Sequence, residues 1–192
     1  MTANAACDRY MITGYFKAHT TLFDRVNMAL AQGIRLIQFR APWLGQNEYI
    51  SLAQALSNTV RAADATLIIK GDDSLLGQPW CHGLHLTSHQ LITNAKAQKH
   101  HTGQLLAASC HDAAQIKLAQ AMSVDFITLS PVRPTPCHRD ASSLGLAQAT
   151  KLTATTAIPV FWLGGMTTAD IATAQRLGAC GIAAIREFWC RH

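Results

Sequence analysis

The glycines Gly164 and Gly165 are the most specific chemical signal in the sequence. An apolar, strand-like run leads into the pair, and Thr167 or Thr168 can cap the helix that follows. Two glycines allow the backbone to approach a ligand closely, and their free N–H groups can point at phosphate oxygens. The pattern therefore predicts a phosphate site, and an ordinary tight turn is the alternative.

Cysteine and histidine adjoin each other three times along the chain, at 81–82, 110–111 and 137–138. Thiolate sulfur and imidazole nitrogen bind zinc, but this spacing matches none of the standard zinc signatures. A nucleophilic Cys110 or Cys137 would need a lowered pKa and a neighbouring base, which a sequence does not show. We therefore assign no metal ligand and no cysteine nucleophile.

The composition describes one ordinary globular domain, residues 1–192. Hydrophobic residues make up 49% of the chain and charged residues 14%, which argues against disorder. The net charge of +5 favours an anionic partner. Because the basic residues are scattered, with no run of five, we expect a phosphorylated small molecule and no nucleic acid.

The cellular location follows from what the sequence does not contain. No apolar run approaches the ~20 residues of a membrane span, and the N-terminal segment lacks the apolar core of a secretory signal. The cysteines include no C-x-x-C pair, and a reducing compartment would keep them as thiols. We therefore expect a cytoplasmic protein with no membrane partner.

Short β-rich runs alternate with segments of helical spacing along the chain. The strand-like runs are 10–12, 36–39, 66–69, 84–86, 105–107, 126–129, 160–163 and 182–185, and the helical patterns are 21–32, 47–63, 111–122 and 168–177. Glycines stand where several helices should end, at Gly33, Gly103 and Gly178. The alternation predicts a parallel sheet. Its strand number favours a single closed (β/α)8 TIM barrel over an open doubly wound sheet.

The C-terminal end of the sequence is short for such a barrel. TIM barrels typically have ~250 residues, and here the chain stops at His192, soon after the last strand-like run. A full outer helix has no room there, so we expect the last outer helix to be missing. A second copy of the chain could cover that surface, which makes a homodimer one expectation. Chemistry in these barrels lies where strands end and helices begin.

At these strand ends the residues resemble the thiamine phosphate synthase/TenI family. The likeness covers nearly the whole chain, and its pieces appear in the order of the family. They are Ile37-Gln-Phe-Arg, Gly83-Leu-His-Leu, Ala108-Ser-Cys-His, Val124-Asp-Phe-Ile-Thr-Leu-Ser-Pro-Val with Thr135 after it, Gly145, and Ile158-Pro-Val leading to Gly164-Gly165-Met166. The closest likeness is to the synthase-like domain that is fused behind Nudix hydrolases in some bacteria.

The resemblance implies a (β/α)8 fold and a reaction in thiamine biosynthesis or salvage. Synthases of this family join a hydroxymethylpyrimidine diphosphate to a thiazole phosphate and release pyrophosphate, while magnesium neutralises the leaving group. TenI members tautomerise a thiazole phosphate instead. The resemblance implies that the ligand bound at the turn of Gly164 and Gly165 is a thiazole-type phosphate.

The resemblance also places the diphosphate near the second strand. Gln38 and Arg40 fall on the family's Gln-x-Arg-x-Lys stretch, which grips the diphosphate, and the lysine of that stretch is Pro42 here. An arginine suits this task because its guanidinium donates two hydrogen bonds to one phosphate. Half of the family's clamp is therefore absent from this sequence.

The usual magnesium ligands are replaced as well. Synthases end the third strand in Asn-Asp, where this chain has Lys70 and Gly71, and Gln90 stands where a second metal aspartate belongs. Asp72 and Asp73 follow one and two residues late. Magnesium prefers carboxylate oxygens. Lys70 is therefore a candidate for supplying a fixed positive charge in place of the ion.

The loop after the sixth strand matches the family in part. Ser130 and Thr135 correspond to serine and threonine contacts of the synthases, and a family lysine is replaced by His138. The TenI catalytic histidine aligns with Pro131, so an enzyme of that type needs another base. His111 and His138 are the candidates, because histidine titrates near neutral pH.

Together these arguments give a set of candidate site residues. The candidate catalytic residues are Arg40, His111 and His138, and the candidate ligand-binding residues are Gln38, Lys70, His85, Ser109, Ser130, Thr135, Gly164, Gly165, Ala184 and Ile185. The histidine within the fourth strand either contacts a pyrimidine-type ligand or is a hydrogen-bonded core residue. Magnesium is the one cofactor that the resemblance implies.

Three functions remain open at the level of sequence. A synthase-type transferase is favoured by the length of the likeness. A TenI-like tautomerase or another metal-independent salvage enzyme is favoured by the missing aspartates. A non-catalytic sensor of phosphate ligands, or an accessory to a Nudix hydrolase, is favoured by the same losses and by the likeness to the Nudix-fused domain.

Overall fold

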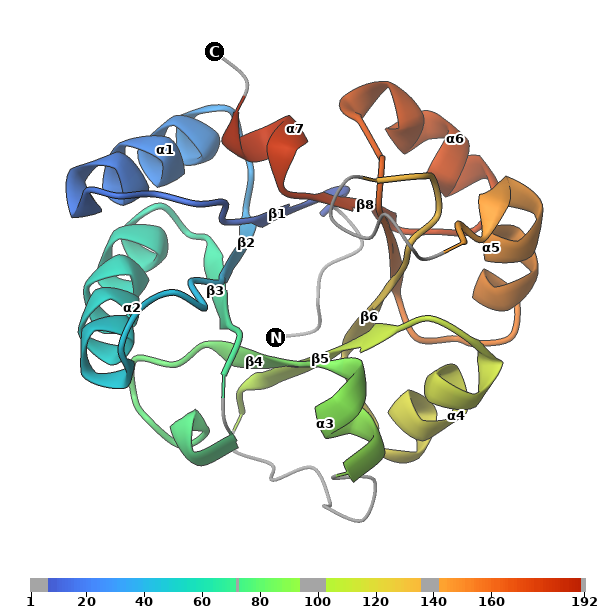
Figure 1. Ribbon diagram of the computed structural model, residues 1–192, viewed down its shortest axis with the longest axis horizontal. Helices are drawn as coiled ribbons and strands as arrows, with labels where there is room; N and C mark the ends of the chain where they lie inside the picture. The colour runs from blue at the N-terminus through green and yellow to red at the C-terminus, as the bar shows by residue number, and fades with distance from the viewer. Residues whose placement is uncertain (1–6, 72, 94–102, 136–141, 191–192) are drawn as a thin grey trace.

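In the described residues, 7–71, 73–93, 103–135 and 142–190, eight parallel strands close into a barrel with helices around it (Figure 1). The coordinates are a computed structural model. The strands are β1 (Arg9–Ile12), β2 (Leu36–Phe39), β3 (Thr66–Ile69), β4 (Gly83–Leu86), β5 (Leu105–Cys110), β6 (Phe126–Leu129), β7 (Val160–Leu163) and β8 (Gly181–Ala184). The predicted (β/α)8 fold is confirmed.

The helices lie outside the strands, and the described residues also contain short 3-10 turns. The helices are α1 (His19–Ala31), α2 (Gln46–Ala62), α3 (Ser88–Thr93), α4 (Ala113–Ala121), α5 (Gly145–Thr153), α6 (Ile171–Arg176) and α7 (Arg186–Trp189), and the 3-10 turns are η1 (Asp73–Leu75) and η3 (Thr168–Asp170). The sequence predicted α1, α2, α4 and the η3–α6 pair to within two residues at most boundaries. It did not indicate α3 or α5, each of which has fewer than ten residues.

Each strand is buried on both faces, which explains why the strands read as apolar runs and not as alternating patterns. Inside the barrel, the rings of Tyr10, Phe126 and Phe161 meet with centroid distances of 5.3 to 5.7 Å. The residues one position along, such as Ile127 and Trp162, pack against the helices. Alternation along a strand therefore decides which side chains can reach the barrel mouth.

The long helices present one apolar face to the barrel, and α1 and α6 are each followed by a glycine. Buried residues of α1 recur at helical spacing, at Leu22, Val26 and Leu30. Gly33 and Gly178 have φ angles of +81° and +95°, the left-handed conformation that ends a helix at little cost for glycine. The predicted helix ends at Gly33 and Gly178 are confirmed, and that at Gly103 stays a prediction because residues 94–102 lie outside the described residues.

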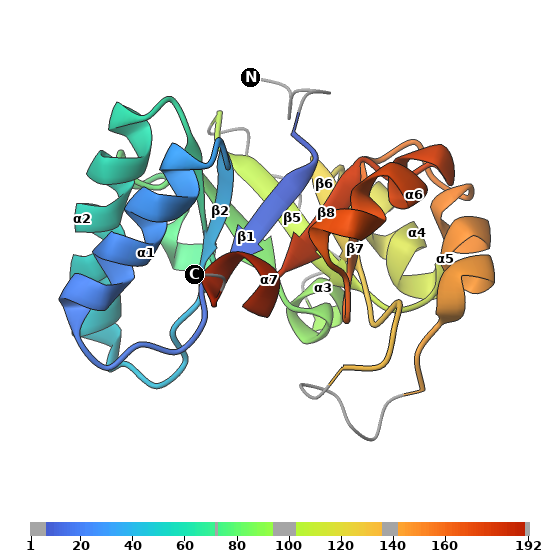
Figure 2. The same cartoon turned by 90° about the horizontal axis from the view of Figure 1, so that it is seen from above.

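The last outer helix is reduced to a single turn and is not missing, which corrects the sequence-based expectation. The indole of Trp189 is buried and packs beside Phe16, and its Nε1 donates to the Tyr15 carbonyl at 3.1 Å. A side chain at Gly14 would collide with that indole. Figure 2 shows α7 alongside α1, close to β1. The buried side chain of Trp189 thus packs beside α1 and β1, where the sequence predicted no outer helix.

Among the described residues, no helix combines the length and the apolar character needed to cross a bilayer.

Candidate active site

The carboxyl ends of the strands form two pockets at the same end of the barrel, and a buried polar chain runs between strands below them. We call the first the β7–β8 pocket, because Ser130, Gly164, Gly165, Ala184, Ile185 and Arg186 line it. We call the second the β2–β4 pocket, because Arg40, Pro42, Lys70, Gly71, Thr87 and Gln90 line it. Most of the described candidate residues thus line these two pockets, whereas Gln38, His85 and Ser109 belong to the chain below them.

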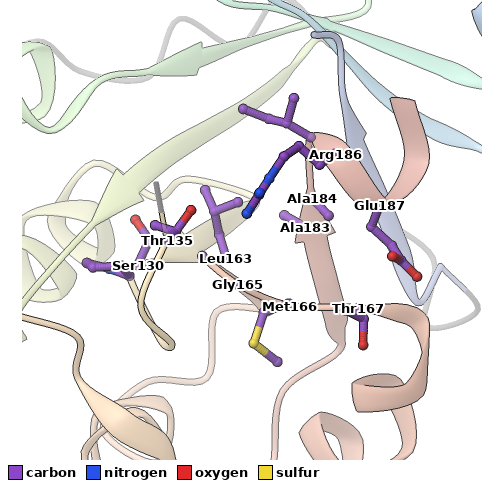
Figure 3. Close-up of a pocket in the computed structure, with 13 residues that line it drawn as sticks. Ser130, Thr135, Leu163, Gly165, Met166, Thr167, Ala183, Ala184, Arg186 and Glu187 are labelled. Atoms are coloured by element: carbon purple, nitrogen blue, oxygen red, sulfur yellow. The ribbon is translucent and has the colours of Figure 1, made fainter. Parts of the chain in front are cut away.

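The β7–β8 pocket has a volume of about 280 Å³ and combines an apolar wall with polar groups at its rim (Figure 3). Leu163 and Ala184 supply apolar surface, and Ser130 and Thr135 supply hydroxyl groups. Among the described residues, no protein group accepts a hydrogen bond from the backbone N–H of Gly165 or of Met166. The pocket can therefore hold a small ring beside an anionic group.

The two glycines are needed by the fold as well as by a ligand. Gly164 and Gly165 have φ angles of +96° and +64°. A Cβ at Gly164 would lie 2.9 Å from the Cα of Pro131, and one at Gly165 would lie 2.8 Å from the Cβ of Arg133. The turn and the phosphate site, which the sequence offered as alternatives, are therefore compatible at this position.

Carboxylates already cap the helical turn that follows the glycines. Thr167 is the N-cap residue, and its backbone N–H and hydroxyl both donate to Asp170 at 3.0 Å. The backbone N–H of Thr168 donates to Glu187 at 2.7 Å, and Arg133 pairs with Asp170 at 2.6 Å. A phosphate must therefore bind the free N–H groups of the glycine turn, because those of the helix start are taken.

Arg186 is a site residue that is missing from the candidate set, although its neighbour Ile185 belongs to that set. It follows β8 directly and is exposed at the pocket, where Figure 3 shows its side chain extending toward Leu163. Its position after the eighth strand was the available signal, since these barrels often bind phosphate beside their last two strands. The guanidinium adds a positive charge to a pocket that otherwise offers backbone N–H groups and hydroxyl groups.

A chain of hydrogen bonds crosses the barrel below the mouth and contains three of the candidate ligand-binding residues. Gln38 Nε2 donates to the Tyr10 hydroxyl at 2.8 Å, which lies 3.2 Å from His85 Nδ1. His85 Nε2 lies 3.0 Å from the Ser109 hydroxyl. The Tyr10 hydroxyl accepts one bond and donates the next, so Nε2 of His85 carries the proton.

This chain keeps its histidine neutral. Burial, with a smaller contribution from the charge of Lys70, lowers the pKa of His85 to about 3. Both ring nitrogens have protein partners. The structure therefore favours the core interpretation of His85, and Ser109 is the member that is only partly buried. Gln38 is likewise engaged inside the barrel and does not line either pocket.

His111 stands beside the β7–β8 pocket with one free nitrogen. Its Nδ1 lies 2.6 Å from the carbonyl oxygen of Ser130, to which it donates. Among the described residues, Nε2 has no hydrogen-bond partner, so it is available as a proton acceptor. The neighbouring Cys110 is buried among the helices, and burial raises the pKa of its thiol to about 12, with a smaller contribution from Asp112. That pKa does not suit a nucleophile.

The β2–β4 pocket is the larger of the two, at about 590 Å³. Arg40 and Lys70 share it, and burial together with the nearby guanidinium lowers the pKa of the Lys70 ammonium. The Tyr49 hydroxyl lies 2.9 Å from the carbonyl of Phe39 and 2.8 Å from that of Lys70, which fixes the ends of β2 and β3. The predicted positive charges therefore lie together on a rigid support.

The remaining predicted positions are placed as follows. Ala184 and Ile185 line the β7–β8 pocket with Ser130 and Thr135. His138 lies outside the described residues, so its candidacy stays a prediction. His82, in the first Cys-His pair, lies before β4 at the opposite end of the barrel, where its Nδ1 accepts from the backbone N–H of Leu67 at 3.1 Å.

The family model for thiamine monophosphate synthase, TMP-TENI, matches residues 9–188 of this chain. The chain belongs to the thiamine monophosphate synthase family. It is thus a thiamine phosphate synthase-like protein of the transferase class. The recognition made from the strand-end motifs is confirmed.

Individual relatives agree with this assignment. A protein of Geobacter sulfurreducens, provisionally named a thiamine-phosphate synthase, is 32% identical over 92% of this chain and 84% of its own length. A thiamine-phosphate synthase of Methanoculleus marisnigri is 29% identical over 93% of this chain and 85% of its own length. The thiamine phosphate pyrophosphorylase of Pyrococcus furiosus has a similar structure, with a TM-score of 0.76 at 21% identity, over 94% of this chain and 86% of that one.

Proposed function

We propose that this member of the family joins a pyrimidine diphosphate to a thiazole phosphate and releases diphosphate. The observation that supports this most is the pair of anion-binding pockets at one barrel mouth. One offers the free N–H groups of Gly165 and Met166 with Arg186. The other offers Arg40 and Lys70. Two phosphorylated substrates that react with each other need such an arrangement.

The chemistry requires no proton acceptor for bond formation. The C–O bond between the pyrimidine methylene carbon and the diphosphate breaks, and its electron pair leaves with the diphosphate. The lone pair of the thiazole nitrogen forms the new C–N bond. Arg40 and Lys70 would stabilise the charge that develops on the leaving oxygen, and the β7–β8 pocket would hold the thiazole phosphate in line.

Steady-state kinetics of two arginine variants tests this division of the mouth. Arg186→Ala should raise KM for the thiazole phosphate about 10- to 100-fold, because a hydrogen bond to a charged group contributes about 1.5–3 kcal/mol. Arg40→Ala should instead raise KM for the pyrimidine diphosphate. Arg176→Ala, at an exposed position in α6, is the matched control and should change neither.

The product decides among the functions. Purified protein is incubated with both precursors, with and without magnesium, and phosphorus NMR follows thiamine phosphate and diphosphate, which should form in equal amounts. Absence of both products would overturn the transferase assignment. Conversion of the thiazole phosphate alone would identify a tautomerase, and binding without turnover would identify a sensor.

One observation favours the tautomerase as the second candidate. The free Nε2 of His111 lies beside Ser130, which lines the β7–β8 pocket, so a base is available near a bound thiazole. His111→Gln should abolish tautomerisation and leave thiamine phosphate formation largely intact. Loss of both activities would show that the imidazole also serves the transferase.

The partners that we propose are phosphorylated small molecules, without nucleic acid, and a second copy of the chain. The homodimer stays a prediction. The candidates for such a contact are Tyr15 and Trp43, which are 69% and 37% exposed. Their rings pack edge to face, and Trp43 also contacts Phe16, which packs against Trp189 of α7. Light scattering that gives the mass of a single chain would refute it.

A further inference from the structure

Two cationic side chains converge on the β2–β4 pocket from neighbouring strands. Arg40 lies two residues beyond Gln38, which is inside the barrel, and Lys70 lies two residues beyond Ile68, which belongs to the inner core. Side chains two apart on a strand share a face, so both cations are directed at the mouth. Both side chains line the β2–β4 pocket.

These cations lack counterions in the part of the chain that the structure describes. Neither Arg40 nor Lys70 forms a salt bridge or a side-chain hydrogen bond with a described residue. Two like charges that share a pocket repel each other, and the same arrangement stabilises an anion with two charged groups. The pocket is thus built for a multiply charged anion that arrives as a ligand.

Gly71 and Gln90 stand at the two positions where the family resemblance places metal-binding aspartates. These two residues are hydrogen-bonded to each other. Gln90 Nε2 donates to the carbonyl oxygen of Gly71 at 2.9 Å. Gln90 Oε1 accepts from the backbone N–H of Thr87 at 2.9 Å and from its hydroxyl at 3.0 Å. Every oxygen that these two residues could offer to a cation therefore already accepts a hydrogen bond.

This donor set does not fit magnesium. Magnesium needs hard oxygen ligands, usually with at least one carboxylate. Here the two positions offer an engaged carbonyl and an engaged amide beside two positive charges. Within the described residues, no three Asp, Glu, His or Cys side chains gather to hold a metal. Asp72 and the side chain of Asp73 lie outside the described residues, so the experiments below address them directly.

We propose that Arg40 and Lys70 bind the diphosphate group in the β2–β4 pocket without a divalent cation, while the Gln90–Gly71 hydrogen bond closes the position that a metal would occupy. The inference rests on the proposed function for the identity of the anion. In the transfer reaction, the leaving diphosphate then keeps the electron pair of the broken C–O bond against two fixed protein cations. The pocket is large enough for two phosphoryl groups with the pyrimidine methylene carbon still attached.

Calorimetric titration with inorganic diphosphate tests the binding step alone. Binding should be at least as tight in EDTA as in excess Mg²⁺. Lys70→Met should weaken it at least tenfold under both conditions, whereas Lys117→Met, at an exposed position in α4, should leave it unchanged. Binding that requires Mg²⁺, or that survives Lys70→Met, would overturn the inference.

A reverse experiment rebuilds a metal site on the same backbone. The double variant Gly71→Asp, Gln90→Asp removes the closing hydrogen bond and supplies two carboxylates. A Cβ at Gly71 comes closest to the flexible end of Leu75, at 3.0 Å, and its next neighbour, Ile69 Cγ2, lies at 3.7 Å, so the backbone can accept the change. This variant should bind diphosphate more tightly with Mg²⁺ than in EDTA, a dependence that the unchanged protein should lack.

The adjacent aspartates provide the decisive alternative. If Mg²⁺ strengthened binding to the unchanged protein and Asp72→Asn or Asp73→Asn removed that effect, the metal would have ligands here after all and the inference would be wrong. Turnover does not enter these titrations. Failure of thiamine phosphate formation would therefore overturn the proposed function and leave the metal-free binding result standing, and the reverse also holds.

Discussion

At the scale of single residues, the barrel interior uses polar side chains that could have served catalysis for internal hydrogen bonding. One continuous hydrogen-bonded chain connects Gln38, Tyr10, His85 and Ser109. The donor–acceptor distances along it are 2.8 to 3.2 Å. A buried polar group without a partner costs about 1–3 kcal/mol. The hydrogen bonds of the chain therefore offset the cost of burying these polar side chains. The histidine of the chain is consequently neutral at physiological pH.

The low pKa of His85 predicts a dependence of stability on pH. In the unfolded chain a histidine titrates near pH 6.5, whereas in the folded barrel the pKa of His85 is about 3. As the pH falls below about 6.5, the unfolded chain binds a proton that the folded chain does not. The free energy of unfolding should therefore fall by about 1.4 kcal/mol per pH unit between about pH 6 and pH 4 from this residue alone.

Urea unfolding at several pH values measures this contribution as a difference between two proteins. His85→Gln lacks the titrating ring, so its free energy of unfolding should fall less steeply below pH 6 than that of the unchanged protein. His82, whose pKa burial also lowers, is common to both and cancels. Identical slopes would mean that His85 is accessible to protons in the folded state.

At the scale of elements, the segment after β6 packs against the turn after β7 and shapes the β7–β8 pocket. The backbone N–H of Val132 donates to Leu163 at 2.9 Å, and that of Arg133 donates to Gly164 at 3.0 Å. Arg133 then pairs with Asp170 across the same turn. Two loops that are far apart in sequence thus support each other, because the carbonyl groups of Leu163 and Gly164 accept hydrogen bonds from the segment after β6.

Replacement of Gly165 by alanine should damage this contact. The residue has φ +64°, and a Cβ there would lie 2.8 Å from both the Arg133 Cβ and the Pro134 carbonyl oxygen. We expect a loss of about 1–3 kcal/mol in the free energy of unfolding, because alanine is strained at positive φ. Gly45→Ala is the matched control, since nothing lies within 4 Å of its Cβ and φ is −65°.

Thermal or urea unfolding of both variants, with inorganic phosphate titrated in parallel, provides the measurement. Gly45→Ala should lose less than about 1 kcal/mol, because alanine is a poorer N-cap for α2 than glycine but meets no neighbouring atom. Gly165→Ala should lose phosphate affinity along with stability. Unchanged values for both properties in Gly165→Ala would refute the account of this turn.

At the scale of the whole molecule, β3 and β4 are the most weakly paired neighbours in the barrel. The β2–β4 pocket lies at this seam between them. β3 and β4 pair at the single position Ile69 with Leu84, whereas β4 and β5 pair at four positions. Lys70 and Thr87 follow directly on the two strands of this seam, and Gln90 lies in α3, the helix after β4. A ligand that bridges them would therefore join strands that the sheet itself joins weakly.

Hydrogen exchange should reveal this seam. Amides of β3 and β4 should exchange faster than those of β5 and β6, because fewer ladder bonds must break to expose them. Saturating diphosphate should slow exchange at the end of β3 and at the start of α3 and leave β6 unchanged. Uniform protection around the barrel would contradict this view, as would a ligand effect confined to β7 and β8.

The sequence by itself determined the strands, most helices, the closed barrel and the family. These follow from local apolar runs, glycine positions and motif order, which are properties of neighbouring residues. It also indicated the charges of Arg40 and Lys70 and the capping by Thr167, because strand ends and caps are local features.

Only the tertiary structure decided what distant residues do to one another. It assigned Gln38 and His85 to an internal chain, placed Arg186 at the phosphate pocket, and fitted Trp189 where a helix was expected to be missing. It also bonded Gln90 to Gly71, 19 residues away, which the sequence showed only as two lost carboxylates. Hydrogen bonding and burial depend on three-dimensional neighbours, and residues separated by a full βα unit become neighbours only once the barrel has closed.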